Sequence, residues 1–105
     1  MPEMTVVVRW PDHREEECYS PSLVMHDHLV EGSSYTVDDF THRSSLALAI
    51  ASDRVREKFG FACTSAAAST DQIKRSASAY RPDDLVLVVR MWPPLPPTTA
   101  QQETA

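Results

Sequence analysis

Basic residues, glycines and long apolar runs are all scarce in this chain of 105 residues, and each scarcity excludes a class of protein. The formal net charge of −5 argues against a general nucleic-acid or anionic-membrane binder, which normally carries a basic stripe. The apolar runs at residues 46–51 and 85–89 are far shorter than a membrane-spanning helix. The two glycines, Gly32 and Gly60, are too few and too distant to form a phosphate-cradling loop.

The chain also has only two cysteines, Cys18 and Cys63, and their spacing is not that of a disulfide framework or a C-x-x-C motif. Free thiols are the default in the reducing cytosol, so this composition favours a cytosolic setting. Residues 1–4 lack the basic region that begins a secretory signal peptide. We therefore expect a soluble, unexported, cytoplasmic protein without membrane contacts.

The chain is long enough for one modest core, and we expect a single domain over residues 1–92. Apolar and other residues alternate over residues 4–10, which predicts a strand with one face in the core. A tight turn at residues 11–13 leads into a second strand from about residue 14 to 19, whose glutamates are typical of a sheet edge. Residues 93–105 are rich in Pro, Thr and Gln, which predicts a disordered tail.

Two helices are predicted in the middle of the chain. Thr36 caps the first helix, Asp39 follows three residues later, and Gly60 ends it. The second helix runs from a Thr64 or Ser65 cap to about Tyr80. The sequence around Ser20 and Pro21 also permits a short helix or an irregular turn over residues 21–30. The residues expected on the buried stripe of the long helix are Phe40, Ala47, Ile50, Ala51, Val55 and Phe59.

Residues 85–92 form a β-branched run that is apolar on both faces through Val89, which predicts an interior strand beside the first one. The predicted fold is therefore α+β, with a small three-stranded sheet in the order β-β-α-α-β. An optional short helix follows the second strand, and two helices cover one face of the sheet. One helical layer cannot cover all of this apolar surface, so we expect a homodimer.

Cys18 is the candidate nucleophile of the chain. It lies where the second strand ends and a Ser-Pro sequence permits a helix, whose amino end would favour a thiolate. His26 or His28 could then act as a base. The alternative is that Cys18 packs as a small hydrophobe, with Glu16 and Glu17 raising its pKa.

Cys63 follows the first long helix in an apolar setting, which favours a buried structural cysteine. If Cys18 and Cys63 meet in space, a redox switch or a thiolate–imidazole metal site becomes feasible. His26 and His28 point to one side only if they lie on a strand, so their spacing does not by itself predict a metal site. The sequence indicates no particular cofactor.

Four short segments together resemble a known family. They are residues 9–12 (Arg-Trp-Pro-Asp), 17–22 (Glu-Cys-Tyr-Ser-Pro-Ser), 35–40 (Tyr-Thr-Val-Asp-Asp-Phe) and 54–63 (Arg-Val-Arg-Glu-Lys-Phe-Gly-Phe-Ala-Cys). Over roughly residues 4–80, the chain resembles a small bacterial family of nitrogen-starvation-response proteins first named from mycobacteria. The chain has Asp12-His13 where Asp-Gly is expected, which leaves the type of the first hairpin open.

The resemblance implies a context rather than a mechanism. Members are often encoded beside a nitrilase-type hydrolase and several oxidoreductase-like enzymes, in a cluster linked to using nitriles or cyanide as nitrogen. The resemblance assigns no catalytic residue, but its motifs make Tyr19, Ser20 and Cys63 candidate binding residues alongside Cys18.

Two classes of function stay open. The preferred one is a non-enzymatic accessory or regulatory protein of nitrogen limitation, acting as a homodimer that binds a partner enzyme or a small metabolite. The other is a thiol-dependent enzyme or carrier in which Cys18 attacks an electrophilic carbon or sulfur of a nitrile- or cyanide-related substrate.

Overall fold

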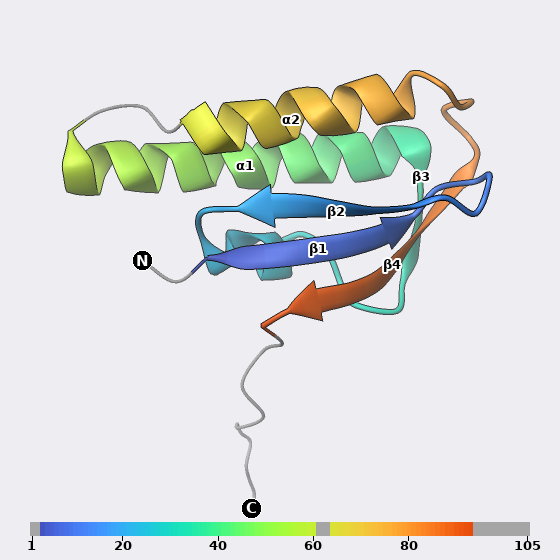
Figure 1. Cartoon of the computed structure of the whole chain (residues 1–105), viewed down its shortest axis with the longest axis horizontal. Coiled ribbons are helices and arrows are strands. Elements are labelled where there is room, and N and C mark those ends of the chain that lie inside the picture. The colour runs from blue at the N-terminus through green and yellow to red at the C-terminus, as the bar shows by residue number, and fades with distance from the viewer. Residues whose placement is uncertain (1–2, 61–63, 94–105) are drawn as a thin grey trace, which may run out of the picture.

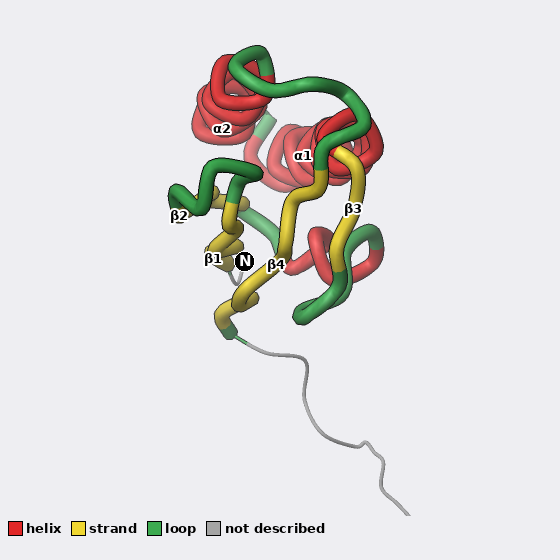
Figure 2. Tube along the Cα trace, turned by 90° about the vertical axis from the view of Figure 1, so that its right-hand side faces the viewer, coloured by secondary structure: helices red, strands yellow, loops and turns green. Residues whose placement is uncertain are grey.

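A four-stranded antiparallel sheet carries the helices on one of its faces (Figures 1 and 2). The computed structural model describes residues 3–60 and 64–93 of the chain. The chain runs through β1 (Met4–Arg9), β2 (Glu15–Ser20), the 3-10 helix η1 (Leu23–Asp27), β3 (Ser34–Thr36), α1 (Val37–Phe59), α2 (Thr64–Ala77) and β4 (Leu85–Trp92). The α+β class and the two covering helices agree with the prediction.

The strand order is β2-β1-β4-β3, so the prediction of a three-stranded sheet was wrong by one strand. The placement of β4 beside β1 and of the glutamate-rich β2 at an edge is confirmed. The extra strand, β3, pairs its three residues with residues 85–87 of β4. Three residues cannot show the alternation of apolar and polar positions that announces a strand in a sequence.

The hairpin between β1 and β2 is closed by hydrogen bonds around Trp10. The Trp10 amide donates to the Arg14 carbonyl at 2.8 Å, and the His13 amide donates to the Trp10 carbonyl at 2.8 Å. His13 has a φ of 71°, in the left-handed region where glycine is favoured. A three-residue loop that ends in a left-handed residue is a common hairpin connection. His13 thus adopts the backbone conformation that suits the glycine expected at this position.

Helix α1 begins and ends where its capping residues predict. The Thr36 hydroxyl accepts a hydrogen bond from the Asp39 amide at 3.1 Å, and Asp38 and Asp39 lie in the first turn. Gly60 takes the left-handed C-cap conformation, with a φ of 80°. These local signals act within one turn of the helix, so the sequence alone was enough to place both ends.

The predicted buried stripe of α1 was only partly right. Phe40, Ala47 and Ala51 are buried, but Ile50 is 37% exposed and Phe59 is 52% exposed. Each helical residue turns by about 100°, so Ile50 lies about 100° around the helix from Ala51. The buried stripe is instead completed by Ser44 and Leu48, which share the face of Ala47 and Ala51.

Helix α2 packs along α1 and over β2 (Figure 1). Its buried residues include Ala66 and Ile73, and it ends at Ala77 rather than near Tyr80, where the sequence predicted its end. Tyr80 lies beyond the helix and stacks on Trp10, with 5.4 Å between the ring centroids and 11° between the planes. Trp10 also meets Phe40 edge-on at 5.6 Å. This aromatic cluster joins the end of β1 to the start of α1 and to the segment that follows α2.

The optional short helix after β2 is present as η1, which packs against α1. Its buried residues, Val24 and Met25, belong to the core. In the part of the chain that the structure describes, no helix has both the length and the apolar character needed to cross a membrane. Of the predicted tail at residues 93–105, residues 94–105 lie outside the described residues.

Candidate functional site

Cys18 lies in the middle of the core rather than at an accessible helix start. It pairs with Val6 across the β1–β2 ladder, and its side chain is fully buried. The short helix that the sequence permitted around Ser20 and Pro21 begins later, and Ser22, four residues after Cys18, caps it. Burial, with a smaller contribution from the negative charge of Glu16, raises the pKa of the Cys18 thiol to about 12. This is the environment of a packing thiol.

Tyr19 and Ser20 follow Cys18 in β2 and lie on opposite faces of the strand, with Ser20 on the same face as Cys18. The buried Ser20 hydroxyl donates to the Ser22 carbonyl at 2.7 Å and accepts from the Ser22 amide at 3.3 Å. These two bonds hold the turn between β2 and η1, which is a structural use of the Cys-Tyr-Ser-Pro-Ser motif. Tyr19 is half-buried on the opposite face of the sheet from Cys18.

The two predicted histidines do not form a shared site. His26 lies in η1, where its Nε2 is 2.9 Å from the Pro93 carbonyl oxygen. His28 follows η1 as its C-cap, and its carbonyl accepts a hydrogen bond from Arg43 at 3.1 Å. Within residues 3–60 and 64–93, no three His, Cys, Asp or Glu side chains are grouped so that they could hold a metal ion. Cys63 lies outside the described residues, so its distance from Cys18 stays untested.

The carboxylate of Glu16, which the sequence did not single out as a site residue, links three parts of the fold. It accepts hydrogen bonds from Trp10 Nε1 at 2.8 Å, Gln72 Nε2 at 2.5 Å and Ser76 Oγ at 2.6 Å, and Arg14 lies 3.4 Å away. Burial raises the pKa of Glu16, but the hydrogen bonds from Ser76, Gln72 and Trp10, together with Arg14, outweigh it and lower the pKa below 4.5. Strand alternation places Glu16 on the same face of β2 as Cys18, and this was the signal available in the sequence.

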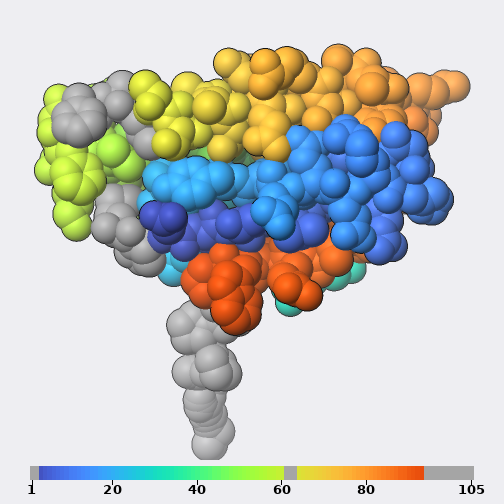
Figure 3. All heavy atoms as spheres, in the orientation of Figure 1, coloured from blue at the N-terminus to red at the C-terminus, as the bar shows by residue number. Residues whose placement is uncertain are grey.

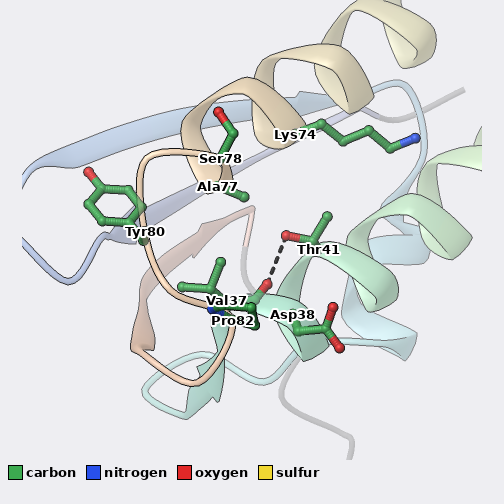
Figure 4. A pocket seen from close by; sticks show the side chains of 8 residues that line it. All are labelled: Val37, Asp38, Thr41, Lys74, Ala77, Ser78, Tyr80 and Pro82. Atoms are coloured by element: carbon green, nitrogen blue, oxygen red, sulfur yellow. Dashed lines mark hydrogen bonds between the residues drawn. The ribbon is translucent and has the colours of Figure 1, made fainter.

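A shallow pocket of about 290 Å³ lies between the start of α1 and the end of α2 (Figure 4). Val37, Ala77 and Pro82 give it apolar walls, and the Thr41 hydroxyl donates to the Val37 carbonyl at 2.8 Å. The Lys74 amine points away from the other labelled side chains in Figure 4. The pocket therefore lacks the few converging polar groups that usually orient a ligand.

The most distinctive surface is the sheet face that no helix covers, which we call the open face. The front of Figure 3 shows β2, β1 and β4 side by side on this face. Leu85 and Trp92 of β4 are 60% and 64% exposed there. The β1–β4 pairing carries an irregularity where Val7 pairs with Arg90 and Val8 with Val88, so alternation in β4 shifts by one residue there. With this shift, the side chains on the open face are Thr5, Val7 and Arg9 of β1, Glu15, Glu17 and Tyr19 of β2, and Leu85, Leu87, Arg90 and Trp92 of β4.

Comparison with protein families gives a match over most of the chain. Residues 5–91 match the family described as Nitrogen starvation-induced protein NitG. The chain belongs to this family. The match confirms the resemblance seen in the short motifs and extends it through β4. Searches among curated proteins and among solved structures found no match. Family membership thus supplies the biological condition, nitrogen starvation, and no residue role.

Proposed function

We propose that this protein is a non-enzymatic accessory or regulatory protein of the nitrogen-starvation response, and that it acts in the cytoplasm as a homodimer. Its partner would be an enzyme of a nitrile- or cyanide-using gene cluster, with a small metabolite as the other candidate ligand. The observation that carries the proposal is the open face, whose exposed Leu85 and Trp92 lie on an interior strand.

An exposed apolar patch on a small protein usually marks an interaction surface. Val7 and Leu87 of the open face are half-buried and lie between Arg9, Glu17 and Arg90. An apolar centre with a charged surround is the usual composition of an interface that forms between folded proteins. A second copy of the chain is always available to such a surface, which supports a homodimer.

The thiol-dependent enzyme remains the alternative, but no described contact favours it. A nucleophilic cysteine needs an accessible thiol with a low pKa. Cys18 is buried, and its pKa is raised to about 12. His26, the proposed base, is engaged with the Pro93 carbonyl. A reaction at Cys18 would require the core to open.

Light scattering across the micromolar range tests the proposal, and we expect twice the mass of one chain. Val7→Lys places a charge at the centre of the open face and should yield a monomer. Val30→Lys is the matched control, because Val30 is 61% exposed and follows η1, away from the open face. A wild-type protein that stays monomeric, or a Val7→Lys protein that stays dimeric, contradicts the proposal.

The biological part of the proposal is tested in cells that depend on the protein during nitrogen limitation. Val7→Lys should impair growth on a nitrile as the nitrogen source, whereas Val30→Lys and Cys18→Ala should support growth like the wild type. Loss of growth in Cys18→Ala, at a normal protein level, would favour the thiol-dependent enzyme instead.

A further inference from the structure

We propose that the second copy covers the open face with its two-fold axis parallel to β1, so that Glu17 of each chain meets Arg90 of the other. This inference rests on the proposed homodimer and adds its geometry. It follows from the register of the strands, which places charged and apolar side chains in rows across the sheet.

The central row of the open face contains one acid, one apolar residue and one base. Val7 pairs with Glu17 on the β2 side and with Arg90 on the β4 side. Neighbouring strands lie about 4.8 Å apart, so the backbones of Glu17 and Arg90 flank that of Val7 at about 5 Å on either side. From β2 to β4, the row therefore carries a negative charge, an uncharged side chain and a positive charge.

Strand pairing and the burial of neighbouring residues place all three side chains on the open face. Cys18, next to Glu17 in β2, is buried in the core, as is Met91, next to Arg90 in β4. The Val6 and Val8 side chains on either side of Val7 are buried as well. Glu17 and Arg90 are exposed, and Val7 is half-buried.

A two-fold axis that runs along β1 reverses the order of this row in the second copy. Glu17 then faces Arg90 of the second copy, Arg90 faces its Glu17, and Val7 faces Val7 on the axis. An axis perpendicular to the strands keeps the order and sets Glu17 against Glu17 and Arg90 against Arg90. Like charges directly opposite each other repel, so the charge pattern selects the axis parallel to β1.

The rows on either side are compatible with the same axis. One row carries Tyr19, Thr5 and Trp92, so Trp92 of each copy faces Tyr19 of the other. In the row on the other side, Arg9 faces Arg9 of the second copy. Each Arg9 guanidinium is 2.7 Å from the Glu15 carboxylate of its own chain, so each Arg9–Glu15 ion pair is neutral and the two arginines do not meet as bare charges. Packed sheets lie about 10 Å apart, a distance that Glu and Arg side chains span together.

Charge reversal at Glu17 and Arg90 tests the geometry. Glu17→Arg and Arg90→Glu should each weaken the dimer by about tenfold or more in the dissociation constant, because each places two like-charge pairs in the interface. The double variant Glu17→Arg with Arg90→Glu should return the constant to within about threefold of the wild type. Sedimentation velocity gives the constants, and thermal melting of each variant verifies the fold.

Two kinds of control make the result specific. The reversals Glu57→Arg and Arg75→Glu change the charge of exposed residues on α1 and α2, and they should leave the dissociation constant unchanged. Glu17→Gln separates the two axes. It weakens the dimer if Glu17 faces Arg90, and it strengthens the dimer if Glu17 faces its own copy.

The outcomes also separate this inference from the proposed function. A dimeric wild type whose double variant is not rescued, or whose Glu17→Gln variant dimerises more strongly, overturns the parallel axis and leaves the homodimer standing. A wild type that is monomeric throughout the micromolar range overturns both. A monomer that becomes a dimer when residues 94–105 are removed overturns both for the full chain, because its own tail would then occupy the open face.

Discussion

The covered and open faces of the sheet are built by the same strands, yet their side chains have different roles. On the covered face, Val6, Val8, Val86 and Val88 join one apolar cluster with the helices. On the open face, apolar side chains alternate with charged ones such as Glu17 and Arg90. The first pattern stabilises the chain by itself, whereas the second suits association between chains that are already folded. Changes on the two faces should therefore have separable effects.

The largest difference between the faces is expected from placing a lysine on each. Val88→Lys puts an unpaired charge into the covered face and should lower the free energy of unfolding by about 3 to 5 kcal/mol. Val7→Lys should lower that of the monomer by less than about 1 kcal/mol, because its amine can reach water. Urea denaturation at low protein concentration measures both. Equal losses for the two variants would refute the distinction between the faces.

The second largest effect is expected at Glu16, whose charged carboxylate lies on the covered face with hydrogen-bond partners. Glu16→Ala leaves the Trp10 indole N–H without its acceptor and should cost about 2 to 3 kcal/mol. Because the pKa of Glu16 is lowered on folding, its carboxylate stabilises the native state above about pH 4.5, and this contribution is lost as the pH falls through the folded-state pKa.

Glu16→Gln tests the pH dependence, since glutamine cannot titrate. The wild type should lose more stability than this variant between pH 5 and the folded-state pKa, which urea titrations at several pH values can measure. Identical pH profiles for the two proteins would show that Glu16 has the same pKa in the folded and unfolded states.

A smaller effect is expected at Cys18. In a Cys63→Ser background, the native Cys18 thiol should resist alkylation even at pH 9, because its pKa is about 12 and no path to the solvent is open. Cys18→Ser should cost about 1 to 2 kcal/mol, since it puts a hydroxyl among apolar side chains. Fast alkylation of the folded protein, with no loss of stability in Cys18→Ser, would restore the thiol mechanism.

The smallest effect lies in the hairpin that joins β1 to β2. His13→Gly should raise the free energy of unfolding by about 0.5 to 1 kcal/mol, because glycine adopts a positive φ without strain. His13→Ala should give no such gain, since alanine meets the same steric cost as histidine. A stabilising His13→Ala would mean that the side chain of His13, and not its backbone conformation, is unfavourable.

Signals that act within one turn or one strand were sufficient to predict most of the fold. The Thr36 and Gly60 caps placed α1, and the glutamates of β2 identified the sheet edge. These features depend on neighbouring residues alone. The three residues of β3 carried no such pattern, because their strand is defined by pairing with a distant part of the chain.

The candidate site was less predictable, because exposure is a property of the packed molecule. Cys18 and Glu17 are adjacent in the sequence, and strand alternation alone does not say which of them the helices cover. The structure turns Cys18 into the core and Glu17 to the open face. The catalytic role predicted for Cys18 with His26 or His28 depended on the opposite exposure.

By itself, the sequence determined the α+β class, the ends of the long helix, the interior position of β4 and, through its motifs, the family. Helix caps and strand alternation depend on neighbouring residues, so they can be recognised in the sequence without a structure. Only the tertiary structure decided that Cys18 is buried, that Glu16 links β2 to α2, and that Glu17, Val7 and Arg90 share one row. Each of these depends on which distant strand or helix lies opposite a residue, and strand register and helix packing set that relation.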